Sequence, residues 1–278
     1  MIEVSNLSFT YRQGARPALD GVTLSVERGD FVGVIGESGA GKSTLGHCIN
    51  GVVPHYYQGD YFGSVAVAGR DTFDCSLTDI AQVVGTVSQD VDGQMVAAVV
   101  EDELRYGLEN FGVSAEEAAA RIDRILAKLG IADLRARKIA TLSGGQKQKV
   151  ALAAVLVLEP EAVLLDEPTS ELDPQSSRQI FELLRTLNDQ GVTVIVIEQK
   201  VMLLCEYAKR LVVMDHGRIA LEGSVEEALG QTDRLVELGV NCPRVALLSA
   251  RLNERGVGDG RVAATVPQAK ELVEEVLA

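Results

Sequence analysis

The chain has 278 residues, enough for one large domain or for one domain with an appendage. Hydrophobic residues make up 46% and charged residues 24%, which is ordinary for a soluble globular protein. The formal net charge of -14 argues against nucleic acid or an anionic membrane surface as a partner, because binding either one needs clustered lysine and arginine.

Cysteine and histidine give no sign of a metal centre. The four cysteines contain no CxxC pair and the three histidines are scattered, so neither a zinc site nor a disulfide framework is predicted. The N-terminus, MIEVSNLSFTY, lacks the basic start and apolar run of a signal peptide. The longest apolar run, Val150 to Leu158, is shorter than the ~20 residues that cross a bilayer. These features predict a cytoplasmic protein, which can still work at a membrane.

Short apolar strands alternate with helical stretches, as in an α/β domain with a largely parallel sheet. Three segments are apolar throughout, which predicts buried parallel strands at 31–36, 162–166 and 192–197. Three other segments alternate or carry tight-turn residues, which predicts antiparallel strands at 21–30, 63–71 and 210–223.

Helical spacing of isoleucine and leucine predicts amphipathic helices over 115–129 and 176–187. Almost everything within 94–159 has a helical pattern, which predicts a helical subdomain inserted into the sheet domain. After Gly223 the pattern changes to short helices, and a last acidic helix is expected over 268–277.

The first candidate site directly follows the strand over 31–36. The segment GESGAGKST is a full match to the phosphate-binding pattern GxxxxGK[ST], and it comprises Gly36, Glu37, Ser38, Gly39, Ala40, Gly41, Lys42, Ser43 and Thr44. Its glycines let successive N–H groups point at one phosphate, and the following helix adds its dipole. Lys42 is predicted to hold the β- and γ-phosphates and Ser43 to ligate Mg²⁺. A glycine-rich turn without a ligand is the alternative.

A second strand ends in two carboxylates, Asp166 and Glu167. Open α/β sheets bind their ligands at the carboxyl ends of the strands. Asp166 is suited to hold Mg²⁺ through its water shell, and Glu167 to polarise or deprotonate an attacking water. An acidic pair at a strand end is weak evidence alone, but beside a phosphate loop it becomes strong evidence for a nucleotide site.

A third motif, LSGGQ at 142–146, opens a long helix. Ser143, Gly144 and Gly145 therefore present a hydroxyl and free N–H groups at a helix N-terminus, which predicts a second anion site. The alternative is that Ser143 is only a helix cap followed by glycines.

These three motifs, in this order, resemble the nucleotide-binding subunit of an ABC transporter over roughly residues 1–223. The resemblance implies an α/β, P-loop NTPase (RecA-like) core with an antiparallel β subdomain, the helical subdomain at about 94–159, and a helical C-terminal tail at 224–278. In this family two subunits meet head to tail around ATP and Mg²⁺. Residues of LSGGQ would then close over ATP held by the other chain: Ser143, Gly144, Gly145 and Gln146.

The resemblance assigns further roles to single residues. Tyr11 stands where the family stacks an aromatic ring on adenine, although an ordinary core tyrosine is the alternative. Gln89 matches the glutamine that senses Mg²⁺ and contacts the transmembrane partner. Asp173, the last residue of SELD, matches the aspartate that communicates across the dimer.

One position departs from the family pattern. The strand over 192–197 runs into Glu198-Gln199-Lys200, and Gln199 stands where the family has a histidine that contacts the γ-phosphate. Glutamine can donate a hydrogen bond to a phosphate oxygen, but it can carry neither a proton nor a positive charge. We therefore expect slower turnover with intact ATP binding, unless the alignment slips and no group is needed here.

Several segments resemble the ATPases of energy-coupling factor (ECF) importers of vitamins and metal ions: VVPHYYQGDYFGSVAVAGRDT, SQDVDGQMVAAVVEDELRYGLEN and VIVIEQK. The closest likeness is to ATPases related to double-cassette thiamin-precursor systems. The tail over 224–278 resembles the extension that helps hold ECF ATPase dimers together. The segment Gln89 to Glu101 would form part of the groove for the transmembrane scaffold, with a solvated loop as the alternative.

The leading hypothesis is thus an ABC-type ATPase that powers import of a small nutrient at the cytoplasmic face of a bacterial-type membrane. Its expected partners are a second ABC ATPase, identical or a sister chain, a transmembrane scaffold and a substrate-binding membrane subunit. Two alternatives stay open. One is a poorly hydrolysing regulatory subunit, which only Gln199 favours. The other is a soluble ABC-type clamp on DNA or ribosomes, whose usual coiled coil, zinc cysteines or second cassette this sequence lacks.

Overall fold

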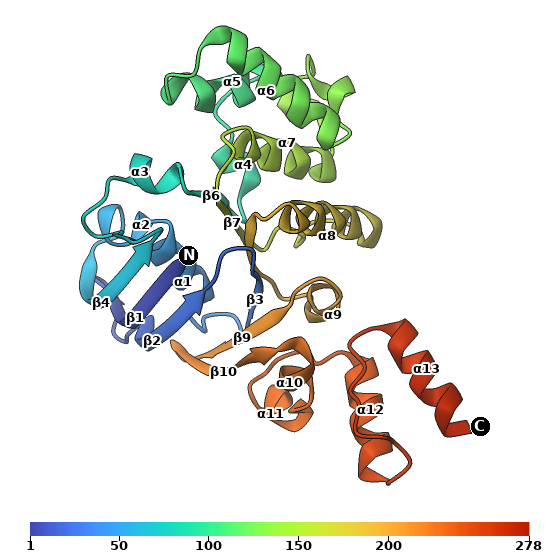
Figure 1. Cartoon of the computed structure of the whole chain (residues 1–278). Helices are drawn as coiled ribbons and strands as arrows, with labels where there is room; N and C mark the ends of the chain where they lie inside the picture. Colours follow the sequence, from blue (N-terminus) through green and yellow to red (C-terminus); the bar gives the residue numbers. More distant parts are fainter. Residues whose placement is uncertain (278) are drawn as a thin grey trace.

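The computed structural model describes residues 1–277, which form two β-sheets, a group of helices and a helical C-terminal segment (Figure 1). The larger sheet has the order β10-β9-β3-β8-β7-β6. Its strands are β3 (Phe31–Ile35), β6 (Val84–Val87), β7 (Ala162–Asp166), β8 (Thr193–Ile197), β9 (Arg210–Asp215) and β10 (Arg218–Ser224). All neighbours pair in parallel except β9 and β10, which form an antiparallel hairpin. The predicted parallel sheet and hairpin are confirmed.

The central strands of this sheet, β3, β7 and β8, are almost wholly apolar because both faces are covered. Successive side chains of a strand point to opposite faces, and in β7 they enter two separate cores. Val163 and Leu165 join the larger hydrophobic cluster with the helices, whereas Ala162 and Leu164 join the smaller cluster under the second sheet. Every residue of β3 and β8 is buried. The sheet therefore holds its carboxyl-terminal edge in a fixed position between two packed layers.

The second sheet is antiparallel, with the order β2-β1-β4-β5. Its strands are β1 (Ile2–Tyr11), β2 (Leu19–Val26), β4 (Gly59–Val67) and β5 (Arg70–Asp71), and it covers α1 (Lys42–Ile49). The strand β1 was not among the predicted strands, although it pairs with both β2 and β4. Register shifts between Val4 and Phe9 break its alternation, which hides the strand period in the sequence.

The helices predicted within 94–159 are present, and Figure 1 shows them on the side of the large sheet away from the tail. They are α5 (Val100–Asn110), α6 (Ala115–Lys128) and α7 (Gly144–Leu156), with α4 (Val91–Gln94) and the 3₁₀ turns η1 (Ala132–Leu134) and η2 (Ile139–Thr141). Helix α6 buries the predicted apolar stripe, including Ile122. Helix α8 (Pro174–Asp189) starts two residues earlier than predicted because Asp173 caps it and proline suits its first turn. Short helices complete the chain at α2 (Val52–His55), α3 (Leu77–Ala81) and α9 (Val201–Cys205).

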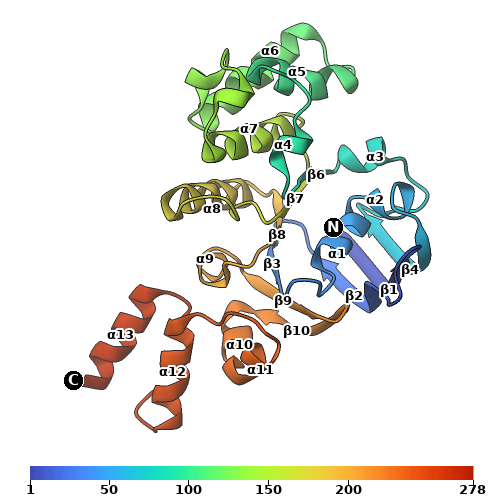
Figure 2. The ribbon, with the colours of Figure 1, turned by 180° about the vertical axis from the view of Figure 1, so that it is seen from behind.

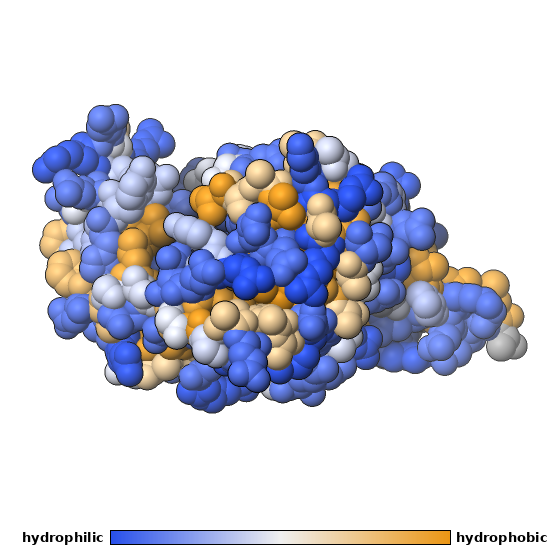
Figure 3. All heavy atoms as spheres, turned by 90° about the horizontal axis from the view of Figure 1, so that it is seen from above, coloured by the Kyte–Doolittle hydropathy of each residue, from blue (hydrophilic) through white to orange (hydrophobic). Residues whose placement is uncertain are grey.

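The C-terminal segment consists of α10 (Val225–Leu229), α11 (Thr232–Glu237), α12 (Arg244–Glu254) and α13 (Val266–Leu277). Leu229 and Leu235 are fully buried in the same cluster as the large sheet, so α10 and α11 pack on the main core. Helices α12 and α13 pack on each other and extend away from the helical group in both ribbon views (Figure 2). From above, the surface is mostly hydrophilic with small apolar patches (Figure 3). Within residues 1–277, no helix combines the length and apolarity needed to span a membrane.

Candidate functional site

The carboxyl ends of β3, β7 and β8 bring the predicted site residues to one edge of the large sheet. Strand β3 leads into the phosphate loop, while β7 and β8 are paired up to Asp166 and Ile197. Beyond that pair, Glu167 N donates to Ile197 O at 2.9 Å. Glu198, which follows Ile197, donates its backbone N–H to Val34 O at 3.1 Å. These backbone bonds hold the segments after β7 and β8 side by side, next to the loop after β3.

Two glycines of the phosphate loop are required by its backbone. Gly36 has φ 145° and Gly41 has φ 102°, both in the region that favours glycine. A Cβ at Gly36 would lie 2.2 Å from Met214 O, and one at Gly41 would lie 2.5 Å from Ala18 O. Helix α1 then begins without a side-chain cap. Its first-turn N–H groups are therefore open to an anion, as the motif predicts.

Lys42 lies inside this loop and is only 5% exposed. Its Nζ donates to Gly36 O at 2.9 Å and to Glu37 O at 2.8 Å. Since a lysine ammonium has three N–H donors, one remains for a phosphate oxygen. Burial lowers the pKa of Lys42, while the charges of Glu167 and Asp166 act in the opposite direction. The two carboxylates therefore support the charged form that a phosphate needs.

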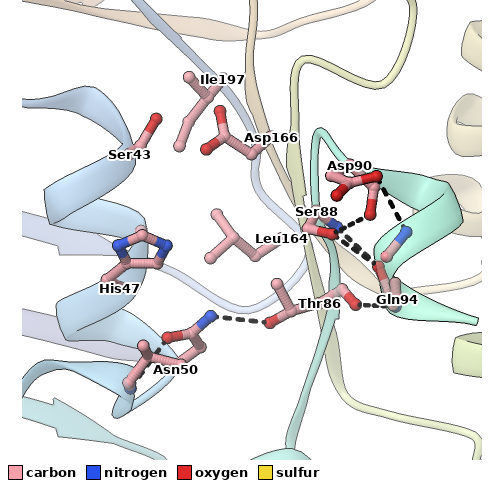
Figure 4. A pocket seen from close by; sticks show the side chains of 13 residues that line it. Ser43, His47, Asn50, Thr86, Ser88, Asp90, Gln94, Leu164, Asp166 and Ile197 are labelled. Atoms are coloured by element: carbon pink, nitrogen blue, oxygen red, sulfur yellow. Dashed lines mark hydrogen bonds between the residues drawn. The ribbon is translucent and has the colours of Figure 1, made fainter. Parts of the chain in front are cut away.

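Asp166 meets the requirement for a magnesium site. Its Oδ1 is buried and has no hydrogen-bond partner. Ser43 and Asp166 line the same cavity of about 450 Å³ (Figure 4). An unpaired carboxylate oxygen and a hydroxyl fit a hydrated Mg²⁺ that takes its other ligands from phosphate and water. Among residues 1–277, no cluster of three or more histidine, cysteine or acidic side chains suits a metal held by protein alone.

Glu167 is held between two glutamine side chains. Gln199 Nε2 donates to its Oε1 at 2.5 Å, and Gln89 Nε2 donates to its Oε2 at 3.1 Å. The backbone of Glu167 has φ 48°, an uncommon value for a residue other than glycine, which turns the chain directly after β7. Gln89, predicted near Mg²⁺, also lines a neighbouring pocket with Ser43 and Asp166. The structure thus brings Gln89 and Gln199 together at Glu167, a contact that the sequence did not predict.

The LSGGQ segment forms the N-terminus of α7, as predicted. Gln146 N donates to Ser143 Oγ at 3.4 Å, and Ser143 N donates to Gln146 Oε1 at 3.0 Å, which is a capping box. Within the single chain Ser143 is thus a helix cap, and the second anion site stays a prediction. A Cβ at Gly144 would lie 3.8 Å from Leu172, so this segment borders the SELD loop.

The Asp173 side chain caps the N-terminus of α8. Its Oδ1 accepts the N–H of Gln175 at 2.9 Å and of Ser176 at 3.0 Å, and its Oδ2 accepts the Ser176 hydroxyl at 2.6 Å. The bonds from Ser176 hold the pKa of Asp173 below its usual range. A role across a dimer stays a prediction.

Tyr11 ends β1 beside the phosphate loop. Its hydroxyl lies 3.1 Å from Thr44 Oγ1, and burial raises its pKa. The ring meets Phe9 edge-on at 4.8 Å between centroids and Tyr57 at 5.9 Å. The hydroxyl contact ties the aromatic side chain to the loop that would hold the phosphates. Stacking on adenine stays a prediction.

No sequence motif predicts a role for Glu198, Lys200 or Thr169. Glu198 is 1% exposed and Thr169 is fully buried. The available signal was the polar triplet 198–200 after an apolar strand, but a role was predicted only for its middle residue, Gln199.

Comparison with known proteins places this geometry in context. The ABC transporter family profile matches residues 19–170. A putative ABC transporter ATP-binding protein of Pyrococcus abyssi is 39% identical over 92% of this chain and 92% of its own length. The putative HMP/thiamine import ATP-binding protein YkoD of Bacillus subtilis is 37% identical over 91% of this chain. This chain spans only 47% of YkoD, about half its length.

Two solved structures share the fold. The cbiO1 protein of Clostridium perfringens, described as part of the ABC transporter complex cbiONQ, superposes with a TM-score of 0.75 and 30% identity over 89% of this chain and 97% of its own. The ATP-binding cassette MJ0796, in a dimeric post-hydrolysis state with ADP and Pi, gives a TM-score of 0.70 and 26% identity over 81% of this chain and 99% of its own.

Proposed function

The chain belongs to the ABC transporter family as an ATP-binding subunit, and from that premise we propose that it powers import of a small nutrient through an ECF-type membrane complex. It is an ABC-type ATPase with a P-loop NTPase fold. The observation that carries the ATPase part of this proposal is the meeting of Lys42, Asp166 and Glu167 at one edge of the large sheet. These are the groups that phosphoryl transfer to water requires.

Each of these residues has a distinct part in the proposed reaction. The open N–H groups of α1 and the free N–H of Lys42 bind the β- and γ-phosphates and stabilise their charge. Glu167 accepts a proton from, or polarises, the water that attacks the γ-phosphate in line. Ser43 and Asp166 would hold Mg²⁺, which neutralises charge on the phosphates when it is bound. Gln89 and Gln199 keep the Glu167 carboxylate directed at one point.

The proposed active unit is a head-to-tail dimer, with a second copy or a sister chain. Ser143, Gly144, Gly145 and Gln146 would close over ATP bound to the partner, and Asp173 would face it. The free N–H groups at the start of α7 support this proposal, because a helix N-terminus favours an anion. Tyr11 would stack on the adenine of the nucleotide bound by its own chain.

The ECF assignment rests on the likeness to cbiO1 and YkoD and on the helices after β10. In the proposed complex, residues 224–278 join the two ATPases, and the segment from Gln89 to Glu101 meets a transmembrane scaffold. A substrate-binding membrane subunit would select the nutrient, a vitamin, a vitamin precursor or a metal ion. The chain would then act at the cytoplasmic face of the membrane.

Copurification tests the importer proposal. The full chain is tagged, extracted from its native membranes in mild detergent, and its partners are identified. We expect a multi-helix scaffold and a small membrane protein, with ATP hydrolysis that Glu167→Gln abolishes. Recovery of only soluble proteins or nucleic acid would overturn the proposal.

A second candidate is a regulatory subunit that binds ATP and hydrolyses it poorly. Gln199 at the place of a histidine is the observation that favours it, since an amide cannot supply a charge to the γ-phosphate. Under this alternative, a sister chain copurifies and supplies most of the activity of the complex, and Glu167→Gln in this chain leaves that activity nearly unchanged.

A further inference from the structure

Glu198 is a buried carboxylate at the end of β8, and both of its oxygens are fully engaged. Oε1 accepts hydrogen bonds from Thr169 N at 3.2 Å and from the Thr169 hydroxyl. Oε2 accepts the backbone N–H of Gln199 at 2.8 Å and of Lys200 at 3.1 Å. One side chain therefore joins the segment that follows β7 to the segment that follows β8.

Lys200 joins the same two segments, but as a hydrogen-bond donor rather than an acceptor. Its Nζ donates to Thr169 O, to Leu172 O at 3.2 Å and to Ser177 Oγ at 3.3 Å. All three donors of the ammonium are used, and they reach across the 167–173 loop to α8. Glu198 thus accepts hydrogen bonds from the 167–173 loop, and Lys200 donates hydrogen bonds to it. The segment after β7 and the segment after β8 therefore form one hydrogen-bonded unit.

The loop held in this way has a candidate functional residue at each end. Glu167 lies at its start, where Gln199 Nε2 donates to it, and Asp173 lies at its end, where it caps α8. Glu198 fixes the backbone of Gln199 on one side and Thr169, two residues after Glu167, on the other. The distance between the Gln199 amide and the Glu167 carboxylate therefore depends on Glu198.

We propose that Glu198 is a positioning residue that, with Lys200 and Thr169, sets the alignment of Glu167 for hydrolysis and couples it to the 170–173 loop. The inference rests on the proposed ATPase role of Glu167. A displacement at Asp173 is carried to the Gln199–Glu167 pair through the hydrogen bonds of Glu198 and Lys200, which tie the 167–173 loop to the segment after β8. Glu198 touches neither nucleotide nor water in this scheme, so it affects turnover and leaves ATP binding intact.

The decisive variant is Glu198→Gln. A carboxylate is acceptor-only, whereas an amide turns an NH₂ group toward N–H donors at Thr169 or at Gln199 and Lys200, whichever way it is oriented. We expect kcat to fall by about tenfold to a hundredfold, as for a small misplacement of a catalytic group, with KM and nucleotide affinity within about twofold of the wild type.

Glu103→Gln is the matched control. Glu103 is another buried carboxylate, 8% exposed, and its Oε2 accepts the N–H of Val96 at 3.0 Å and of Ala97 at 2.7 Å in the helical group. The same chemical change there should lower stability without a selective loss of kcat. If both variants lose kcat in proportion to their stability, Glu198 is only structural and the proposal is overturned.

A second pair of variants avoids loss of the buried charge. Thr169→Val keeps the shape of the side chain and removes the hydroxyl donor, while Thr169→Ser keeps the donor. We expect a severalfold lower kcat for the first and near wild-type kcat for the second. Equal kcat in the two variants would contradict the proposed link.

Hydrogen exchange gives a readout independent of hydrolysis. In Glu198→Gln, peptides covering 167–173 and 198–200 should both exchange at least about tenfold faster than in the wild type. Faster exchange in only one of them would overturn the coupling. A wild-type chain without Glu167-dependent hydrolysis would overturn the proposed ATPase role, and the exchange result would still decide whether Glu198 joins the two segments.

Discussion

Replacement of Gln199 by histidine tests how the amide acts on Glu167. An imidazole places its Nε2 the same number of bonds from Cα as the glutamine amide nitrogen does. Because Glu198 holds the backbone N–H of residue 199 at 2.8 Å, the new ring should take the place of the amide. The variant therefore exchanges a neutral donor to Glu167 for one that is charged below its pKa.

The size of the effect follows from the two kinds of hydrogen bond. The acceptor oxygen is charged in both proteins, so the difference is the charge added to the donor, and two unit charges about 4 Å apart attract by about 1 kcal/mol in bulk water. If the imidazolium also acts on the γ-phosphate, where charge develops in the transition state, a gain of about 1 kcal/mol raises kcat about fivefold. Histidine has an unperturbed pKa of about 6.5, and the neighbouring carboxylate raises it. The gain is therefore complete below that pKa and is lost as pH rises through it.

The assay is steady-state ATP hydrolysis of the wild type and Gln199→His from about pH 5.5 to 8.5, reported as the ratio of their kcat values. Taking the ratio removes titrations common to both proteins. Glu167→Gln in each background shows that the measured rate depends on the carboxylate. A ratio that stays at one over the whole range would refute the reasoning.

Three further predictions concern stability and ATP affinity. The Arg135 hydrogen bonds, with those of Arg105, lower the pKa of Glu101 to about 2 from 4.5. Glu101 therefore contributes about 1 kcal/mol of stability above pH 4.5, after solvent screening, and this contribution is lost as pH falls toward 2. Thermal unfolding should show that the stability difference between wild type and Glu101→Gln shrinks below pH 4.5. Gly36→Ala places a Cβ 2.2 Å from Met214 O and should weaken ATP binding about tenfold or more by calorimetry. Ile122→Ala, at a fully buried position of α6, should cost about 2–5 kcal/mol in urea unfolding.

Each of these has an opposing outcome. A Glu101→Gln difference that is the same at pH 7 and pH 3 would mean that the lowered pKa of Glu101 contributes no stability. Wild-type ATP affinity in Gly36→Ala would mean that the loop accommodates a side chain. A loss below about 1 kcal/mol in Ile122→Ala would mean that the helical group relaxes around the cavity.

The large sheet was predictable because its residues follow simple rules. Strands buried on both faces lack alternation, and β3, β7 and β8 stand out as short apolar runs between helical segments. The phosphate loop and the acidic pair were also predictable, since their chemistry fixes residue type at each position. The strand β1 was missed because its register shifts conceal the two-residue period.

The contacts of Glu167 were beyond prediction from sequence. Gln89 and Gln199 are separated by 78 and 32 residues from Glu167, and only the order of strands in the sheet brings them to its two oxygens. The role of Glu198 depends on burial, which a polar residue does not reveal in a sequence. Local motifs thus predicted which residues form the site, while tertiary structure determined which of them touch.

The packing of α10 and α11 has a practical consequence for shortening the chain. A chain cut after Gly223 would lose Leu229 and Leu235 from the main core and would leave an apolar surface uncovered. If such a fragment failed to dimerise, that failure could not be distinguished from misfolding. A cut after Cys242 keeps α10 and α11, and from the main core it removes the buried Ala246 and Ala264 together with α12 and α13. That breakpoint is the better one for testing the proposed role of the tail between subunits, because it removes fewer core side chains.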